Sequence, residues 1–360
     1  MKKAIWTALC TVCLLLGLAL PALAADLGEP NITTQTTMRE LRENSSIKGS
    51  GYYTYSNEWS EEDPRWMDST IEDYVGAAEA QDVVSAMNLV INNYNRGVQI
   101  TWQVYSPEEI AENVRLGMVQ LYYFPANTAN AKFAIVVPGN GGFTTSELGE
   151  GGSMAWQLHE AGYAVFVLRY RSFMEATDNA PVQDIGNAVR YVINHAAQFE
   201  VQPEDYALVG FSSGGQIVGL IGSDSKEFGY QAFGIPQPAA LLLGYPINDF
   251  AEVKPVYHVV IDPTAFGWRY YWTNISDVVN ANYTPVFFWY GKNDVYMKRM
   301  GFCLQGPTLQ RALEASGATY KCLVFENAPH AIGTGRGTDA EGWVQQAVAF
   351  WEEQVARRHS

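Results

Sequence analysis

The sequence predicts a mixed α/β fold in which a mostly parallel, eight-stranded sheet is flanked by helices. From about residue 98, short β-branched or aromatic runs alternate with longer amphipathic stretches, the pattern of strands joined by crossover helices. The later runs are continuously apolar, which favours strands covered on both faces over a half-exposed antiparallel sheet. Of the 360 residues, 48% are hydrophobic and 17% are charged, so the chain can bury one large core.

The eight expected strands and five expected helices follow one another over the last three quarters of the chain. The strands cover residues 98–104, 119–124, 133–137, 164–168, 206–209, 239–243, 286–290 and 320–325, and the helices cover residues 153–161, 182–197, 213–222, 308–316 and 342–357. We expect no helix between the first two strands, and this pair followed by strand-helix alternation indicates a mixed α/β topology.

Residues 1–24 have the three parts of a secretory signal. Met1-Lys2-Lys3 is followed by an apolar run and then by Pro21-Ala22-Leu23-Ala24, which predicts cleavage after Ala24. An uncleaved membrane anchor is the alternative, because this run approaches the ~20 residues that span a bilayer. Both interpretations predict a secreted or cell-envelope protein. If the signal is cleaved, we expect no further membrane contact.

Residues 25–97 precede the predicted catalytic domain at 98–360. Residues 26–60 are rich in Ser, Thr, Asn and Gly, so we expect an exposed or flexible lead-in. Residues 68–94 repeat apolar side chains at helical intervals, which predicts one or two helices packed against the core; a dimer contact or an active-site lid is the alternative. Within the domain, an aromatic-rich insertion at about 245–283 is expected to form a wall of the substrate pocket.

The formal net charge of −15 disfavours nucleic acid and anionic lipid as partners and favours a neutral substrate. Cys10 and Cys13 leave with the signal. Cys303 and Cys322 are separated by a predicted helix that would carry them to opposite ends of the layer, so we expect free thiols, with a disulfide as the alternative. No His or third Cys stands at a metal-ligand spacing from this pair.

The strongest chemical signal is Gly210-Phe211-Ser212-Ser213-Gly214, a G-x-S-x-G match between a predicted strand and a predicted helix. A serine on such a sharp turn is lifted to the edge of the sheet, and small neighbours prevent clashes. The interpretation is that Ser212 is a nucleophile. An ordinary Gly/Ser turn is the alternative.

A glycine-rich turn, Pro138-Gly139-Asn140-Gly141-Gly142-Phe143, follows the strand at 133–137. Glycines let backbone N–H groups face a substrate, so Gly141 or Gly142 together with the N–H of Ser213 would form an oxyanion hole. A plain turn is the alternative.

An acid and a base follow the serine in the required order. Asp294 lies just beyond the strand at 286–290, and His330 lies just beyond the strand at 320–325. Loops after parallel strands open on the same edge of a sheet, which would bring both side chains to Ser212. The remaining alternatives for the base and the acid are His258, Asp249, Asp262 and Asp277.

These residues resemble the bacterial acetyl esterase branch of the α/β-hydrolases over about residues 98–357. That branch carries a Pro-Gly-Gly-Gly-Tyr turn, a Glu-Gly pair and a strand that ends in Leu-x-Tyr-Arg. The counterparts here, in chain order, are Pro138 to Phe143, Glu150-Gly151, Leu168 to Arg171, Pro181 to Asp184, Gly210 to Gly215, Tyr245-Pro246, Asp294 and Pro329-His330. This sequence departs from the branch in its longer Asn140-Gly141-Gly142 turn, in Val295-Tyr296 after the acid, and in the extension at 26–95.

The resemblance implies an α/β-hydrolase fold and a serine esterase without metal or organic cofactor. Its substrate would be a small-molecule or carbohydrate ester, and members of the branch often remove acetyl groups from xylan. Two other classes remain open: a serine peptidase of the prolyl-oligopeptidase type, and a binding protein of the same fold without catalysis. The sequence predicts no oligomeric state.

Overall fold

A computed structural model describes residues 32–54, 63–139, 145–172, 175, 179–248 and 273–360. The predicted signal and most of the predicted aromatic insertion lie outside these ranges. The strands are β1 (Thr101–Gln103), β2 (Gln120–Phe124), β3 (Phe133–Val137), β4 (Ala164–Arg169), β5 (Ala207–Phe211), β6 (Ala240–Gly244), β7 (Val286–Gly291) and β8 (Tyr320–Phe325).

The helices lie before, between and after these strands. They are α1 (Met38–Glu43), α2 (Ser45–Ser50), α3 (Pro64–Met67), α4 (Ile71–Val75), α5 (Ala77–Asn95), α6 (Pro107–Glu112), α7 (Ser153–Glu160), α8 (Ala180–Asn194), α9 (Ala196–Phe199), α10 (Ser212–Ile221), α12 (Ile275–Val278), α13 (Val295–Met300), α14 (Gln305–Ser316) and α15 (Trp343–Arg358), with the shorter turns η2 (Val114–Met118), η3 (Glu147–Gly152) and η6 (Tyr230–Phe233). In the described part of the chain, no helix combines the length and the apolar character that crossing a membrane requires.

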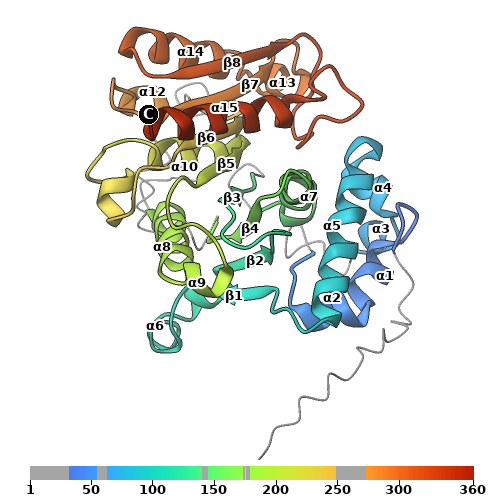
Figure 1. Cartoon of the computed structure of the whole chain (residues 1–360). Helices are drawn as coiled ribbons and strands as arrows, with labels where there is room; N and C mark the ends of the chain where they lie inside the picture. The colour runs from blue at the N-terminus through green and yellow to red at the C-terminus, as the bar shows by residue number, and fades with distance from the viewer. Residues whose placement is uncertain (1–31, 55–62, 140–144, 173–174, 176–178, 249–272) are drawn as a thin grey trace, which may run out of the picture. The chain divides into compact units, whose positions relative to one another are not determined.

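The eight strands form one sheet in the order β1-β2-β4-β3-β5-β6-β7-β8 (Figure 1). β2 runs antiparallel to β1 and β4, and the remaining neighbours are parallel. The predicted fold class is therefore confirmed. The expectation of no helix between the first two strands is wrong, because α6 and η2 lie between β1 and β2. Because the parallel strands are in register at their carboxyl ends, the loops after β3, β5, β6, β7 and β8 open on the same edge.

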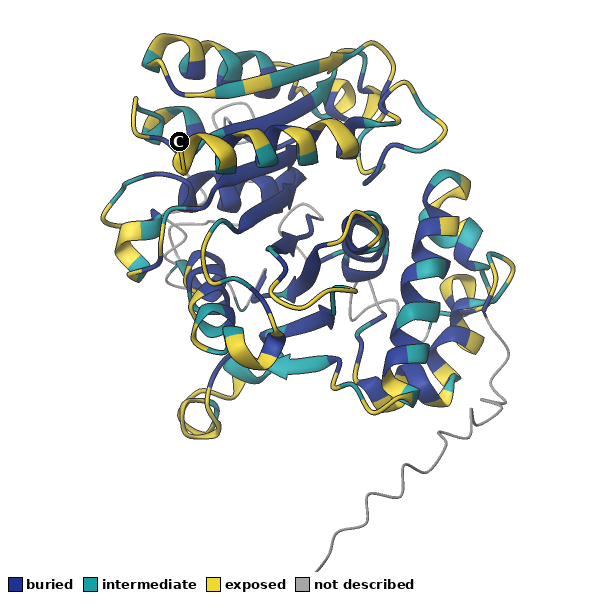
Figure 2. Cartoon of the chain, in the orientation of Figure 1, coloured by how far each residue is buried: buried dark blue, intermediate teal, exposed yellow. Residues whose placement is uncertain are grey.

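Alternate side chains of the central strands enter two hydrophobic cores, one on each face of the sheet. One core contains residues of α8, α10 and α14, and the other contains residues of α5, α7 and α15. In Figure 2 the central strands are buried along their length, whereas the outer surfaces of α14 and α15 are exposed. This double cover explains why the later strands have continuously apolar sequences.

The expectation of an exposed lead-in is wrong for residues 32–54. Met38 and Leu41 are completely buried, and Ile47 of α2 is 1% exposed. The hydroxyl of Thr37 accepts from the Glu40 N–H, and the Glu40 carboxylate accepts from the Thr37 N–H, a capping box that stabilises the first turn of α1. The polar residues that suggested a flexible segment are the caps and outer faces of short helices.

The extension joins the sheet through direct contacts. α4 and α5 occupy the predicted helical segment at 68–94, and α5 packs against α7, beside which it stands in Figure 1. The Tyr52 ring lies 4.5 Å from the Tyr122 ring of β2, and its hydroxyl donates to the Glu147 carbonyl at 2.8 Å. Residues of α1, α2, α4 and α5 thus share one core with β2, β3 and β4.

Cys303 is exposed and Cys322 is half-buried, and both thiols are free. This agrees with the expectation that the helix between them, now α14, keeps them apart.

We expect Leu41→Ala to destabilise the whole folded unit by about 2–5 kcal/mol, because it leaves a cavity in the shared core. Val114→Ala is the control, since Val114 is 80% exposed. Urea unfolding followed by circular dichroism and by tryptophan fluorescence measures the effect. An unchanged midpoint for Leu41→Ala would show that the extension is not part of the core.

Candidate active site

Ser212 occupies the sharp turn between β5 and α10. Its φ angle is +49°, a left-handed conformation that costs a non-glycine residue about 1–2 kcal/mol. A Cβ at Gly139 would lie 2.6 Å from the Phe211 carbonyl, and one at Gly214 would lie 2.5 Å from the Pro138 carbonyl. Larger side chains would therefore push the turn after β3 away from Ser212, which explains the glycines at these two positions.

The structure brings Ser212, His330 and Asp294 together. The Ser212 Oγ lies 2.8 Å from His330 Nε2, and His330 Nδ1 lies 3.1 Å from Asp294 Oδ2. The three groups come from the loops after β5, β8 and β7, which meet at one edge of the sheet. With the imidazole proton on Nδ1, that nitrogen donates to the carboxylate and Nε2 accepts from the hydroxyl.

Two further contacts hold the acid and the imidazole in place. The Asp294 carboxylate caps α13, because its Oδ1 accepts from the Met297 N–H at 3.0 Å while Oδ2 faces His330. The Tyr296 ring stacks on the imidazole, with ring centroids 5.4 Å apart and an interplanar angle of 18°. The departure noted at Val295-Tyr296 thus places an aromatic cover on His330, and this cover is itself 58% exposed to solvent.

A buried chain of hydrogen bonds connects the turn after β3 with the loop that carries His330. The Gly139 N–H donates to Glu150 Oε2 at 2.7 Å, and the Tyr245 hydroxyl donates to Glu150 Oε1 at 2.8 Å. The same hydroxyl accepts from the Gly333 N–H at 2.9 Å. Burial raises the pKa of the Glu150 carboxyl and raises that of the Tyr245 phenol well above its ordinary value, so the phenol remains protonated and can donate.

The N-terminal extension also forms hydrogen bonds with the loop that carries His330. Glu79 Oε1 accepts from the Thr334 N–H at 3.1 Å and lies 3.0 Å from its hydroxyl. Asp82 Oδ2 accepts from Arg336 Nε at 2.6 Å and from the Gln157 side chain at 2.8 Å. Two buried carboxylates of α5 therefore fix the chain four to six residues after His330.

The predicted oxyanion donors are only partly described. Ser213 is buried in the first turn of α10, next to Ser212. Gly141 and Gly142 lie outside the described residues. The Gly139 N–H donates to Glu150, so this group is already committed, and a second donor from the turn would have to come from a later residue.

The other histidines of the chain, and the acids named as alternatives to Asp294, are not part of this cluster where the structure describes them. His159 Nδ1 faces the Pro125 carbonyl, His195 Nδ1 faces the Tyr191 carbonyl, and His359 contacts Asp205. Asp277 caps α12 by accepting from the Asn274 N–H at 3.4 Å. His258, Asp249 and Asp262 lie outside the described residues.

The sequence interpretation assigned no role to Glu79, Asp82, Glu150 or Tyr245. Glu150 and Tyr245 stood in the Glu-Gly and Tyr-Pro pairs of the resemblance, which was the available signal for them. Glu79 and Asp82 carried no local signal, because their partners lie more than 250 residues away in the chain.

Solved structures of other proteins identify the fold. A solved carboxylesterase from Lactobacillus plantarum superposes with a TM-score of 0.55 at 18% sequence identity, over 66% of this chain and 92% of that chain. The chain has the α/β-hydrolase fold. The BD-FAE family profile matches residues 119–253 of this hydrolase-fold chain, a segment that includes Glu150, Ser212 and Tyr245.

Two curated proteins resemble the hydrolase-fold chain in sequence. An acetylxylan esterase from Xylanibacter ruminicola is 28% identical over 248 residues, which is 66% of this chain and 49% of that protein. The endo-1,4-beta-xylanase B of Butyrivibrio fibrisolvens is 25% identical over 220 residues, or 58% of this chain and 34% of that protein. The chain thus spans about half and about a third of the length of these relatives.

We expect Glu79→Gln to remove a pH dependence from the stability of the protein. Burial, opposed by hydrogen bonds from Ser153 and Thr334, raises the Glu79 pKa to about 7. An unfolded glutamate titrates near ~4.3, so the unfolded chain releases this proton first. The wild type therefore loses stability as the pH rises from about 4.3 to beyond about 7, by at most about 4 kcal/mol.

Glutamine keeps the acceptor oxygen for Thr334 but cannot ionise. Thermal melts at pH 5, 6, 7 and 8 should show the Tm of Glu79→Gln rising relative to wild type as the pH increases. Glu353→Gln, an exposed replacement on α15, is the matched control and should give a flat difference. A flat difference for Glu79→Gln as well would contradict the raised pKa.

Proposed function

We propose that this protein is a secreted serine esterase that removes acetyl groups from carbohydrate, through an acyl-enzyme on Ser212. The observation that carries the proposal is the pair of contacts at His330, whose Nε2 faces the Ser212 hydroxyl at 2.8 Å while its Nδ1 faces Asp294 at 3.1 Å. A serine hydroxyl is a weak nucleophile at its own pKa and requires such a base.

In the first half-reaction, Ser212 Oγ attacks the ester carbonyl and His330 Nε2 takes the hydroxyl proton. Asp294 stabilises the imidazolium that forms and keeps the ring in its orientation. The tetrahedral intermediate then collapses: the bond to the alcohol oxygen breaks, His330 returns the proton to that oxygen, and the acyl group remains on Ser212.

In the second half-reaction, water attacks the acyl carbonyl while His330 takes one of its protons. Collapse of the second intermediate breaks the bond to Ser212 Oγ, which recovers its proton from His330. The products are the alcohol and the carboxylic acid, and the enzyme is restored without a metal or an organic cofactor in either step.

The negative charge on the intermediate needs donors fixed in advance. We assign this role to the Ser213 N–H at the start of α10, where the helix dipole also favours an anion, together with the N–H of Gly141 or Gly142. The link from Glu150 to the Gly139 N–H supports the assignment, because it holds Gly139, which precedes these glycines in the chain, against Ser212.

Two observations support a neutral carbohydrate ester as the substrate. The acetylxylan esterase described above is similar to this chain over 248 residues, and its activity is the one that we infer here. The net charge of −15 disfavours polyanionic substrates. The predicted signal at residues 1–24 supports secretion, and outside the cell the enzyme would have access to polymeric carbohydrate.

We expect a fluorophosphonate probe to label Ser212, and p-nitrophenyl acetate to be hydrolysed by the wild type. Ser212→Ala should lose labelling and at least ~10³-fold in kcat/KM, since no other hydroxyl faces His330 Nε2 among the described residues. Ser316→Ala, which replaces a serine at the end of α14, is the control and should retain both properties. Peptide mapping by mass spectrometry locates the label.

Two outcomes would exclude the proposal in favour of its alternatives. If the folded protein takes no label and hydrolyses no ester, it is a binding protein of this fold. If it cleaves a p-nitroanilide peptide as readily as the acetate ester, it is a peptidase.

A further inference from the structure

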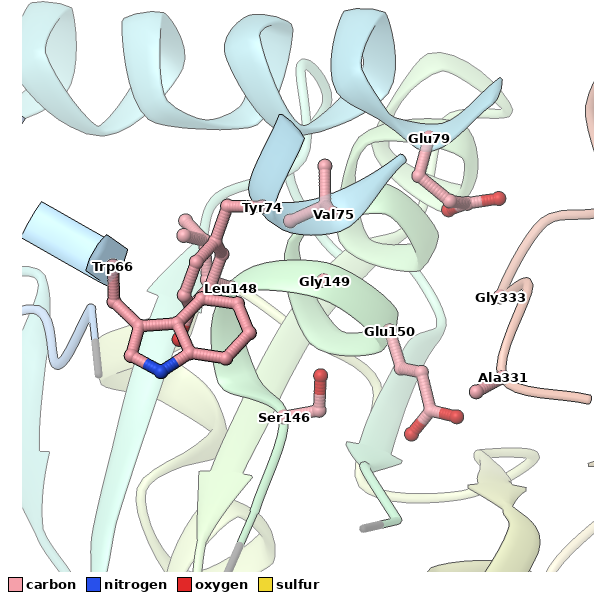
Figure 3. A pocket seen from close by; sticks show the side chains of 10 residues that line it. All are labelled: Trp66, Tyr74, Val75, Glu79, Ser146, Leu148, Gly149, Glu150, Ala331 and Gly333. Carbon is pink, nitrogen blue, oxygen red and sulfur yellow. The ribbon is translucent and has the colours of Figure 1, made fainter. Parts of the chain in front are cut away.

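A pocket lined by Ala331, the residue after His330, has no role in the mechanism so far described. Its volume is about 210 Å³, and its walls come from three segments: the extension, the turn around η3 and the loop after β8. The lining residues are Trp66, Tyr74, Val75, Glu79, Ser146, Leu148, Gly149, Glu150, Ala331 and Gly333. Figure 3 shows Trp66 at one end of the pocket and Ala331 and Gly333 at the other.

Two links connect the wall of the pocket with the catalytic groups. Ala331 directly follows His330, and Glu150 accepts from the N–H of Gly139, which lies against Ser212. A group held in this pocket therefore lies against the residue that follows His330 and against the carboxyl group that holds Gly139 at Ser212. We propose that the pocket binds the sugar ring that carries the acyl group, with Trp66 as its aromatic platform. This inference rests on the proposed esterase function and extends it to the substrate.

The walls of the pocket differ in a way that suits a sugar. Trp66 is 44% exposed, and the Tyr74 ring packs edge-to-face against it at 5.6 Å and 89°, which holds the indole in one orientation. Val75 and Leu148 make the same region apolar. An aromatic face of this kind stacks on the C–H face of a pyranose ring.

Polar groups line the rest of the pocket. The Ser146 side chain and the carboxyl groups of Glu79 and Glu150 supply hydrogen-bonding atoms in the wall near Ala331. Two carboxyl groups disfavour an anionic ligand such as a phosphate or a free acid, whereas the neutral hydroxyls of a sugar can donate to them.

The size of the pocket limits the occupant. Pockets for drug-sized ligands measure ~300–1,000 Å³, so about 210 Å³ suits one sugar ring and not an oligosaccharide. The pocket next to Asp294 and Met297 measures about 30 Å³, the space of a single water molecule. Of these two pockets, the one walled by Trp66 has room for a sugar ring.

Two acetate esters with different alcohols test the proposal. One is methyl β-xyloside carrying a single acetyl group, and the other is methyl acetate, whose alcohol is too small to reach Trp66. For Trp66→Ala, the ratio of kcat/KM for the acetylated xyloside to kcat/KM for methyl acetate should fall about ten-fold, mainly through KM. Trp66→Phe retains an aromatic ring and should recover most of the ratio.

The control is Tyr94→Ala, which removes an exposed aromatic residue at the other end of α5 and should leave the ratio unchanged. In the Ser212→Ala background, which prevents turnover, isothermal titration with the acetylated xyloside should show binding that the added Trp66→Ala change abolishes. This second readout does not depend on catalysis.

The outcomes separate this inference from the proposed function. If the wild type hydrolyses both esters and Trp66→Ala changes both kcat/KM values by the same factor, the pocket proposal is wrong while the esterase stands. A methyl ester of an aromatic acid is the third substrate; a selective loss on this ester would place the acyl group in the pocket and overturn the assignment. If the wild type hydrolyses none of these esters and Ser212 takes no fluorophosphonate, the proposed function itself fails.

Discussion

The hydroxyl of Tyr245 forms hydrogen bonds with two loops whose relative positions the proposed catalysis requires. It donates to Glu150, which also holds the Gly139 N–H, and it accepts from the Gly333 N–H. Tyr245 itself follows β6, so three loops at the carboxyl edge of the sheet depend on a single buried oxygen. The distances around His330 follow from this constraint, because Gly139 lies against Ser212 and Gly333 lies three residues after the imidazole.

A buried carboxylate and phenol are costly to desolvate unless they are satisfied by each other and by the backbone. Here each oxygen of Glu150 accepts one hydrogen bond, and the Tyr245 hydroxyl both donates and accepts. The arrangement therefore exchanges hydration for a fixed geometry. Preorganised geometry of this kind is what a nucleophile, a base and an oxyanion hole require, since misplacement by ~1 Å can cost ~10²-fold in rate.

The N-terminal extension contacts the loops at the same edge of the sheet. Glu79 and Asp82 of α5 hold Thr334 and Arg336, and Trp66 and Tyr74 wall the pocket beside Ala331. The extension thus supports the histidine loop from outside and supplies the aromatic surface that we assign to the sugar. If Trp66 binds the sugar as we propose, one segment serves both specificity for the alcohol and the position of the loop that carries His330.

The sequence was informative wherever the signal is local. Continuous apolar runs predicted the strands, because a doubly covered strand excludes polar residues on both faces. The Gly-x-Ser-x-Gly turn predicted where Ser212 lies, because the sharp backbone favours glycine two residues before and two residues after the serine. The placement of Asp294 and His330 at one edge required only the parallel order of the strands.

Long-range pairing was not readable in the same way. The prediction for the lead-in was wrong because its buried residues, Met38, Leu41 and Ile47, are outnumbered by the polar residues around them. Their burial becomes evident only when α5 packs in the same core. Glu79 and Asp82 looked like ordinary helix surface, because nothing near them in the chain indicates partners at Thr334 and Arg336.

The most direct test of this account is Tyr245→Phe, which removes one oxygen and keeps the ring. The loss leaves Glu150 and the Gly333 N–H each short of a partner and costs about 1–3 kcal/mol in stability, so the comparison is made well below the Tm. The account predicts that the rate of fluorophosphonate labelling at Ser212 falls at least ten-fold in the folded variant. A labelling rate equal to that of the wild type would show that the phenol does not hold the catalytic loops in position.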